Sequence, residues 1–168
     1  MSEENVSDRF DRLPATPEER TVEGRPTRGE ILEWWDDRFG VDADIFEPYS
    51  LWERGNGKIW AFHGEVPSPA EMQALGIRLV RTRQEFWKPT LEAVQRFGHH
   101  ADRNVLELGR EQAERFVAGD EQEVEWDGDW GYLLVTHELA GEQEPLGVGL
   151  FTYGELKSMV PKGRRREL

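Results

Sequence analysis

The last stretch of the chain holds the residues best suited to chemistry. No acidic residue lies between Leu156 and Arg166, and the cations there stand close together: Lys157, Lys162, Arg164, Arg165 and Arg166. The whole chain, in contrast, has a formal net charge of -13 at pH 7. A basic segment in so acidic a chain indicates a polyanionic partner, because each Lys or Arg that contacts a phosphate releases condensed counterions. The alternative is a solvated basic tail that only aids solubility.

A second basic group lies near the middle of the chain. Arg81, Arg83 and Lys88 surround the aromatic residues Phe86 and Trp87. Proteins that bind single-stranded RNA combine these residue types, because cations contact the phosphates and aromatic rings stack on the bases. The alternative is that the aromatic residues belong to the core.

Two pairs of residues support weaker interpretations. Gly147 and Gly149 would let a backbone or a base approach closely, and a bend in a strand explains them equally well. His99 and His100 are adjacent, but no carboxylate or thiol stands at ligand spacing from them. We therefore expect neither a metal site nor a cofactor.

Composition sets the limits for these interpretations. With 168 residues, 37% of them hydrophobic, the chain is long enough for one domain or two very small ones. It contains no cysteine, which excludes disulfides, thiolate zinc sites and thiol nucleophiles. No apolar run approaches the ~18 residues of a membrane span, and no signal peptide is evident. These features predict a soluble, cytoplasmic protein without a membrane partner.

The acidity suggests a particular environment. The chain has 34 acidic residues, and lysine occurs only at Lys58, Lys88, Lys157 and Lys162. A surface rich in carboxylates and poor in lysine suits a cytoplasm of high salt, where repulsion between charges is screened. We infer a halophilic source as a hypothesis.

The first third of the chain predicts three segments. Residues 1–26 are polar and interrupted by prolines, and we expect a flexible arm whose removal leaves the fold intact. Thr27 and Glu30 form a capping box before a helical apolar pattern that ends at Gly40. Two apolar runs then flank Gly55-Asn56-Gly57, which is typical of a β-hairpin turn.

The next segment predicts a helix and a strand. Ser68-Pro69-Ala70-Glu71 reads as a second capping box, opening a helix that Gly76 closes. Residues 77–83 alternate as a strand, which places Arg81 and Arg83 on one face with Ile77 and Leu79, and Arg78 on the other. Residues 27–86 thus form a small α+β unit.

Residues 87–168 favour a compact β-barrel with few helices. A polar turn is expected at 140–144. The predicted elements are a helix at 89–97, a strand at 104–108, a helix at 110–119, and long strands at 130–138 and 145–153.

The order of these elements and the closing motif resemble a known family. From about residue 77 onward the chain resembles the PUA-like RNA-binding domain at the C-terminus of Sun-type (RsmF-type) RNA cytosine-5 methyltransferases. That family ends close to Leu-Lys-Asn, a spacer, Pro-Lys and a final Arg. Here those places hold Leu156, Lys157, Pro161, Lys162 and Arg165. Ser158 stands where Asn is usual.

The resemblance implies RNA binding without catalysis. It gives RNA-binding roles to Lys157, Lys162, Arg164 and Arg165. Residues 27–86 look like the small α+β unit that precedes PUA-type domains in several proteins. Sun-type enzymes attack cytosine with a cysteine, and this chain has none. It also lacks a glycine-rich turn for S-adenosylmethionine.

Two classes of function remain. The first is a stand-alone, non-catalytic RNA-binding protein that acts on rRNA or tRNA in ribosome biogenesis or beside a separate RNA-modifying enzyme. The second is a protein adaptor whose acidic surface docks a basic partner such as a ribosomal protein. An enzyme is not expected, because no nucleophile with a base, no metal cluster and no cofactor loop can be assembled from these residues.

Overall fold

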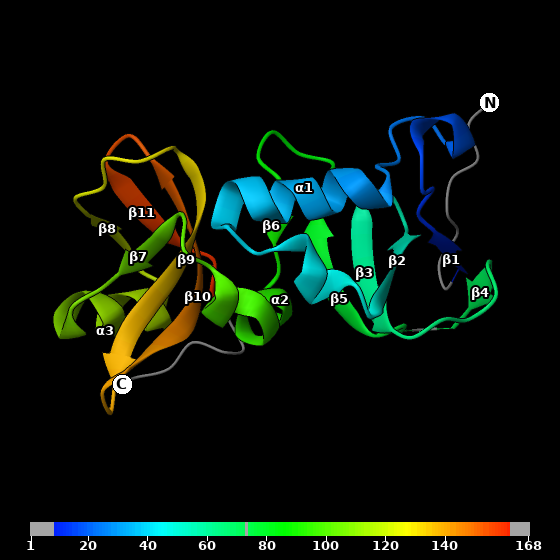
Figure 1. Ribbon diagram of the computed structural model, residues 1–168. Coiled ribbons are helices and arrows are strands. Elements are labelled where there is room, and N and C mark those ends of the chain that lie inside the picture. Colours follow the sequence, from blue (N-terminus) through cyan, green and yellow to red (C-terminus); the bar gives the residue numbers. More distant parts are fainter. Residues whose placement is uncertain (1–8, 73, 162–168) are drawn as a thin grey trace. The chain divides into compact units, whose positions relative to one another are not determined.

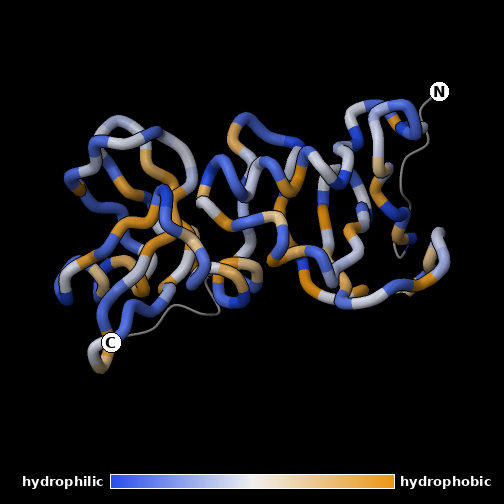
Figure 2. Tube along the Cα trace, in the orientation of Figure 1, coloured by the Kyte–Doolittle hydropathy of each residue, from blue (hydrophilic) through white to orange (hydrophobic). Residues whose placement is uncertain are grey.

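A computed structural model describes residues 9–72 and 74–161, and the chain divides into two compact units, Met1–Lys88 and Pro89–Leu168 (Figure 1). None of the described helices is long and apolar enough to cross a membrane. The mixed α+β class is confirmed, and the second unit consists mostly of strands. Hydrophobic and hydrophilic residues alternate along the chain in both units (Figure 2).

The first unit is built on a six-stranded sheet of order β4-β1-β2-β3-β5-β6. The hairpin expected around Gly55 is present, with Arg54 paired to Lys58. The elements of this unit are β1 (Arg9–Arg12), η1 (Pro17–Glu19), α1 (Arg28–Phe39), η2 (Ala43–Phe46), β2 (Tyr49–Arg54), β3 (Lys58–His63), β4 (Ala70–Glu71), β5 (Ile77–Arg81) and β6 (Lys88–Pro89).

Helix α1 begins and ends where the sequence predicts. The Thr27 side chain accepts a hydrogen bond from the Glu30 amide at 3.1 Å, and the Glu30 carboxylate accepts one from the Thr27 amide at 2.8 Å. Gly40 closes the helix in the left-handed conformation, with φ 70°. Ile31, Trp35 and Phe39 are fully buried.

The prediction of a flexible arm at residues 1–26 is wrong from Arg9 onward. Strand β1 pairs antiparallel with β2 and β4, and Phe10 is fully buried. Arg25 is also buried and donates to the Glu53 carboxylate at 2.7 Å. Strand pairing and an ion pair with distant residues hold this segment in place. Neither contact requires apolar periodicity in its sequence, so the sequence pattern did not reveal it.

The helix predicted at residues 68–76 is also wrong. Ala70 and Glu71 form β4, which pairs with Phe10 and Arg9 of β1. Ala70 and Leu75 are buried in a cluster with Phe10. The free edge of β1 and this apolar cluster outweigh the local capping signal, which stabilises a helix by only about 1 kcal/mol.

The strand at residues 77–83 is confirmed over Ile77–Arg81, but its facing is not as predicted. The register with β3 shifts, since Ile59 faces Val80 whereas Trp60 faces Arg78. Leu79 is therefore an extra residue, and Leu79 and Val80 are both buried. Beyond this bulge Arg81 returns to the face of Arg78, not to that of Ile77.

The second unit is built on a five-stranded sheet of order β7-β9-β10-β11-β8. The expected strands and helices are present, and the β7–β9 pair is parallel. Its elements are α2 (Leu91–Phe97), η3 (Gly98–His100), β7 (Val105–Glu107), α3 (Arg110–Ala118), β8 (Glu121–Glu123), β9 (Gly131–Leu139), β10 (Glu142–Thr152) and β11 (Glu155–Ser158).

Helix α3 and the sheet enclose one apolar core. Phe116 and Val117 of the helix pack with Leu133, Leu156 and Val160 in a single buried cluster. The polar turn predicted at 140–144 is shorter than expected, because residues 142–144 already belong to β10 and pair with β9.

Candidate nucleic-acid interface

Lys157 is the member of the predicted basic segment that the structure describes. It is exposed on β11, a strand that lies between β10 and β8. Its directly paired residue on β8 is Glu121, which is also exposed. Lys162, Arg164 and Arg165 lie outside the described residues. The structure therefore places the start of the basic segment at the surface of the second sheet.

The chain is firmly anchored just before the basic segment continues. Ser158 is buried, and its hydroxyl donates to the Phe116 carbonyl at 2.7 Å. The Met159 amide donates to the Val148 carbonyl at 2.9 Å, and Val160 is buried in the core. Ser158, which replaces the Asn usual in the family, thus joins β11 to α3. Pro161, the last described residue, emerges from a fixed position.

Gly147 and Gly149 lie in the core, not on the surface. Gly147 has a φ of 153° and follows a register shift between β10 and β9. A Cβ at Gly149 would lie 2.5 Å from a methyl carbon of Leu156 and 3.2 Å from the Phe116 ring. Both glycines are buried. Gly149 allows α3 and β11 to pack closely on β10, whereas at Gly147 the positive φ beside the register shift accounts for the glycine.

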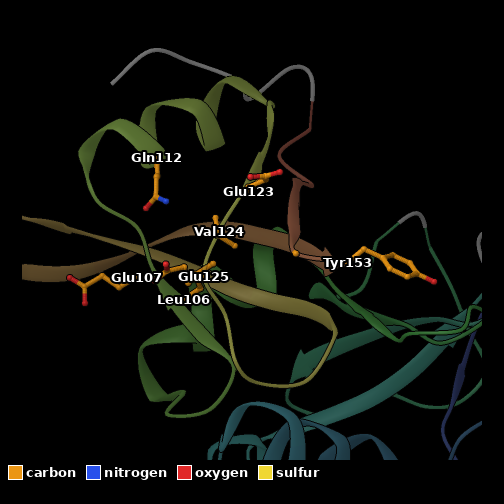
Figure 3. A pocket seen from close by; sticks show the side chains of 8 residues that line it. Leu106, Glu107, Gln112, Glu123, Val124, Glu125 and Tyr153 are labelled. Atoms are coloured by element: carbon orange, nitrogen blue, oxygen red, sulfur yellow. The ribbon is translucent and has the colours of Figure 1, made fainter.

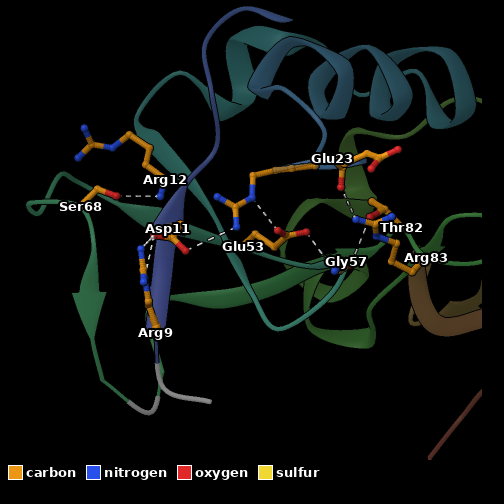
Figure 4. Close-up of polar contacts among 10 residues, drawn as sticks. Arg9, Asp11, Arg12, Glu23, Glu53, Gly57, Ser68, Thr82 and Arg83 are labelled. Carbon is orange, nitrogen blue, oxygen red and sulfur yellow. Dashed lines mark hydrogen bonds and ion pairs between the residues drawn. The ribbon is translucent and has the colours of Figure 1, made fainter. Parts of the chain in front are cut away.

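The second predicted basic group is only partly brought together. Arg81 and Lys88 belong to the neighbouring strands β5 and β6, and burial together with the positive charge of Arg81 lowers the pKa of Lys88. Arg83 serves a different contact, because its guanidinium donates to the Glu23 carbonyl at 3.0 Å (Figure 4). A Cβ at Gly57 would lie 2.3 Å from the Arg83 side chain. Arg83 thus ties the N-terminal segment to the hairpin.

Trp87, one of the two aromatic residues beside that group, packs against another tryptophan of the first unit. The Trp87 ring lies 5.9 Å from the Trp34 ring, between centroids. Trp34 in turn makes an edge contact with Trp35 at 5.1 Å. Trp87 is therefore part of an aromatic cluster around α1, which favours the core alternative for this residue.

The rings of the two adjacent histidines contact each other at an interplanar angle of 39°. Their ring centroids are 4.1 Å apart, and burial together with the charge of His99 lowers the pKa of His100. Within residues 9–72 and 74–161, no three His, Asp or Glu side chains gather in a way that could hold a metal ion.

The second unit also has an acidic hollow that sequence reasoning missed (Figure 3). It has a volume of about 670 Å³, and its lining includes Glu107, Glu123, Glu125 and Tyr153. Tyr153 is 83% exposed, and its ring lies 4.6 Å from that of Trp130, which is 46% exposed. The carboxylates would repel phosphate. The acidic run from Glu107 to Glu144 is the signal that could have located this hollow.

Parts of the chain match known protein families and one known protein. Residues 103–166 match the family described as "Methyltransferase RsmF PUA domain". Residues 1–76 match a "Family of unknown function (DUF7122)". Over 121 residues the chain is 27% identical to "Ribosomal RNA small subunit methyltransferase F" of Aeromonas salmonicida (strain A449). That alignment covers 70% of this chain and 24% of the relative, so the chain spans about a quarter of that protein's length.

The second unit contains a PUA-like domain. More particularly, it is a PUA-like domain of the Sun/RsmF type, as the closing motif predicts. The matched range includes β7, α3 and the strands β8 to β11. It also includes Lys157 and the anchored Ser158.

Proposed function

We propose that this chain is a non-catalytic RNA-binding protein that contacts rRNA or tRNA through the basic end of its second unit. It would act in ribosome assembly or beside a separate RNA-modifying enzyme. The observation that supports this most is the match of residues 103–166 to the RsmF PUA domain. The relative is named for its action on small-subunit ribosomal RNA, which favours rRNA as the first RNA to test.

The anchored end of β11 supports the proposal, because the basic segment begins there. Lys157 is exposed, while its neighbours Leu156 and Ser158 are buried. The residues that follow Pro161 include Lys162, Arg164 and Arg165. A lysine supplies a point charge to a phosphate, and an arginine can donate two hydrogen bonds to it. We infer that these cations line the RNA backbone.

We infer the non-catalytic role from a catalytic residue that the chain lacks and from the part of the relative that it matches. It has no cysteine, the residue that Sun-type enzymes use as the nucleophile. Its similarity to the methyltransferase covers only about a quarter of that protein. This chain would therefore position the RNA, and a methyl transfer would be performed by catalytic residues that lie outside it.

The second candidate is a protein adaptor, favoured by the acidic hollow of the second unit. Tyr153 lines the hollow together with Glu123 and Glu125, and its ring lies 4.6 Å from that of Trp130. Both aromatic residues are exposed. Arginine and lysine side chains of a partner are attracted both by carboxylates and by aromatic faces. In this case the basic end of the chain would have no ligand of its own.

A salt titration separates the two functions. The variant Lys157→Ala/Lys162→Ala/Arg165→Ala should bind a small-subunit rRNA transcript more weakly than the unmodified chain. Because three phosphate contacts are lost, the plot of log affinity against log salt should flatten by about two to three units. Fluorescence anisotropy at several salt concentrations measures both quantities.

The matched control removes the same charge elsewhere in the second unit. Arg103, Arg110 and Arg115 are exposed, so their joint replacement by Ala should leave the slope unchanged. An unchanged slope and affinity in the first triple variant would mean that the basic end does not touch RNA. The adaptor function would then be the better explanation.

A further inference from the structure

One face of the first unit's sheet gathers cations from separate strands. Residues directly opposite each other on paired strands point to the same side. Arg54 faces Lys58, Lys58 faces Arg81, and Trp60 faces Arg78. Lys58 and Trp60 are two residues apart on β3 and so share a side. Arg54, Lys58, Arg78 and Arg81 therefore surround Trp60, and we name these five residues the basic sheet face.

The β-bulge at Leu79 is what completes the basic sheet face. Without the extra residue, Arg78 and Arg81 would point to opposite sides, as the simple alternation predicts. With it, both face the side of Trp60, and both are exposed. The same shift turns Leu79 and Val80 together into the core.

The two arginines nearest Trp60 are held against aromatic rings. The Arg54 guanidinium carbon lies 5.5 Å from the centroid of the Phe10 ring and 6.0 Å from that of Trp60. The Arg78 guanidinium carbon lies 6.0 Å from the centroid of Trp60. Cation–π attraction at such distances stabilises a preferred position of the planar group. A guanidinium fixed in this way loses less freedom when it binds a ligand.

The acidic residues of the neighbouring strand positions point elsewhere or are already paired. Glu53 alternates with Arg54 on β2, lies on the opposite side of the sheet, and is buried with Arg25. Glu65 forms an ion pair with Arg12 at 2.6 Å, and Arg12 faces Trp52 two positions before Arg54. Among the described strand residues that share the side of Trp60, there is no carboxylate.

We propose that the basic sheet face is a second RNA-binding surface, which takes a single-stranded segment. Lys58 and Arg81 are exposed and supply charge to the phosphates. Arg54 and Arg78 add positive charge beside the phosphates, and their guanidinium planes present flat surfaces to unstacked bases. A cationic surface complements a polyanion, not a basic or apolar partner.

This inference shares the RNA ligand with the proposed function but concerns different residues in a different unit. The experiment uses the full chain and a fluorescein-labelled RNA of twelve uridines, with anisotropy measured from low to high salt. Arg54→Gln/Arg78→Gln should flatten the slope of log affinity against log salt by about 1.4, since each contact to a single strand contributes ~0.7.

Two further variants identify the cause of that loss. Arg54→Lys/Arg78→Lys keeps the charges but lacks the planar group, so it should keep the slope and still bind the RNA more weakly. Arg110→Gln/Arg115→Gln removes two exposed charges from α3 and should behave as the unmodified chain. An equal loss in this α3 variant, or no loss in Arg54→Gln/Arg78→Gln, would overturn the inference.

Further measurements distinguish a failure of this inference from a loss of folding and from a failure of the proposed function. If Arg54→Gln/Arg78→Gln lowers the melting temperature, Lys58→Gln/Arg81→Gln changes only exposed side chains and should flatten the slope equally. If the unmodified chain binds rRNA but not the uridine RNA, this inference fails and the proposed function stands. If the Lys157 triple variant binds both RNAs normally while Arg54→Gln/Arg78→Gln does not, the proposed site fails and this surface stands.

Discussion

The two units differ in what they bury. In the first unit Arg25 and Glu53 are only 6% and 2% exposed and form an ion pair across the sheet. In the second unit the buried polar residues that the structure describes are neutral: Gln122, Thr136 and Ser158. The first unit therefore combines its buried apolar residues with a buried charged contact between distant segments, whereas the described buried polar residues of the second unit carry no charge.

This difference reflects how each unit holds its outermost segments. In the first unit, residues 9–26 are joined to the hairpin by the buried pair and by the bond from Arg83 to the Glu23 carbonyl (Figure 4). In the second unit, Leu156 and Val160 join β11 and the following residues to the core by apolar burial. A polar contact specifies which segment binds where, because an unmatched buried charge is strongly destabilising.

Removing residues 1–26 should test this comparison with the largest effect. The truncation deletes β1 together with the buried side chains Phe10, Leu13 and Val22, each of which stabilises by about 1.5–3 kcal/mol. It also leaves Glu53 buried without Arg25. We expect the first unit to unfold while the second remains folded. Calorimetry of the full and truncated chains should show one transition lost, and an unchanged pair of transitions would contradict the role given to this segment.

Replacing Glu53 by Ala should have the next largest effect. The change removes the carboxylate that lies 2.7 Å from the buried Arg25 guanidinium, which also pairs with Asp11 at 3.5 Å, and it removes the acceptor for the Gly57 amide. We expect the free energy of unfolding of the first unit to fall by about 3–5 kcal/mol. Denaturant titration followed by circular dichroism measures this change.

The matched control for Glu53 lies in the second unit. Glu111 pairs with Arg115 at 3.2 Å on the exposed side of α3, and its side chain is 83% exposed. Glu111→Ala should change the free energy of unfolding by less than about 1 kcal/mol, because an exposed pair is screened by solvent. Similar losses in the two variants would mean that the Arg25–Glu53 pair acts as an ordinary surface contact.

The sequence predicts best those elements whose signals are local. Thr27 and Glu30 determine the start of α1, Gly119 determines the end of α3, and Gly55-Asn56-Gly57 determines the first hairpin. Each signal lies within a few residues of the structure that it predicts. Lys157 was likewise placed at the surface by its charge alone.

The elements that were missed depend on contacts between distant residues. Strand β1 forms because Phe10 pairs with Arg54 and Ala70, more than forty residues away in the chain. The bulge at Leu79 is a property of how β5 pairs with β3, so alternation alone gave Arg81 the wrong face. The roles predicted for Lys162, Arg164 and Arg165 lie outside the described residues and stay predictions.

The smallest expected effect concerns the turns of two hairpins, β2–β3 and β9–β10. The first unit places glycine at the positive-φ positions Gly55 and Gly57, whereas the β9–β10 turn of the second unit has Ala140 at φ 52° before Gly141 at φ 84°. Positive φ at both residues defines a type I′ turn, which prefers Asn-Gly. A left-handed conformation costs an ordinary L-residue roughly 1–2 kcal/mol, and Asn less.

Ala140→Asn should therefore raise the free energy of unfolding of the second unit by about 0.5–1 kcal/mol, and Ala140→Val should lower it. Denaturant titration of the full chain, read from the transition of the second unit, measures both changes, and a less stable Asn variant would show that the turn is not under the strain that its φ angle implies.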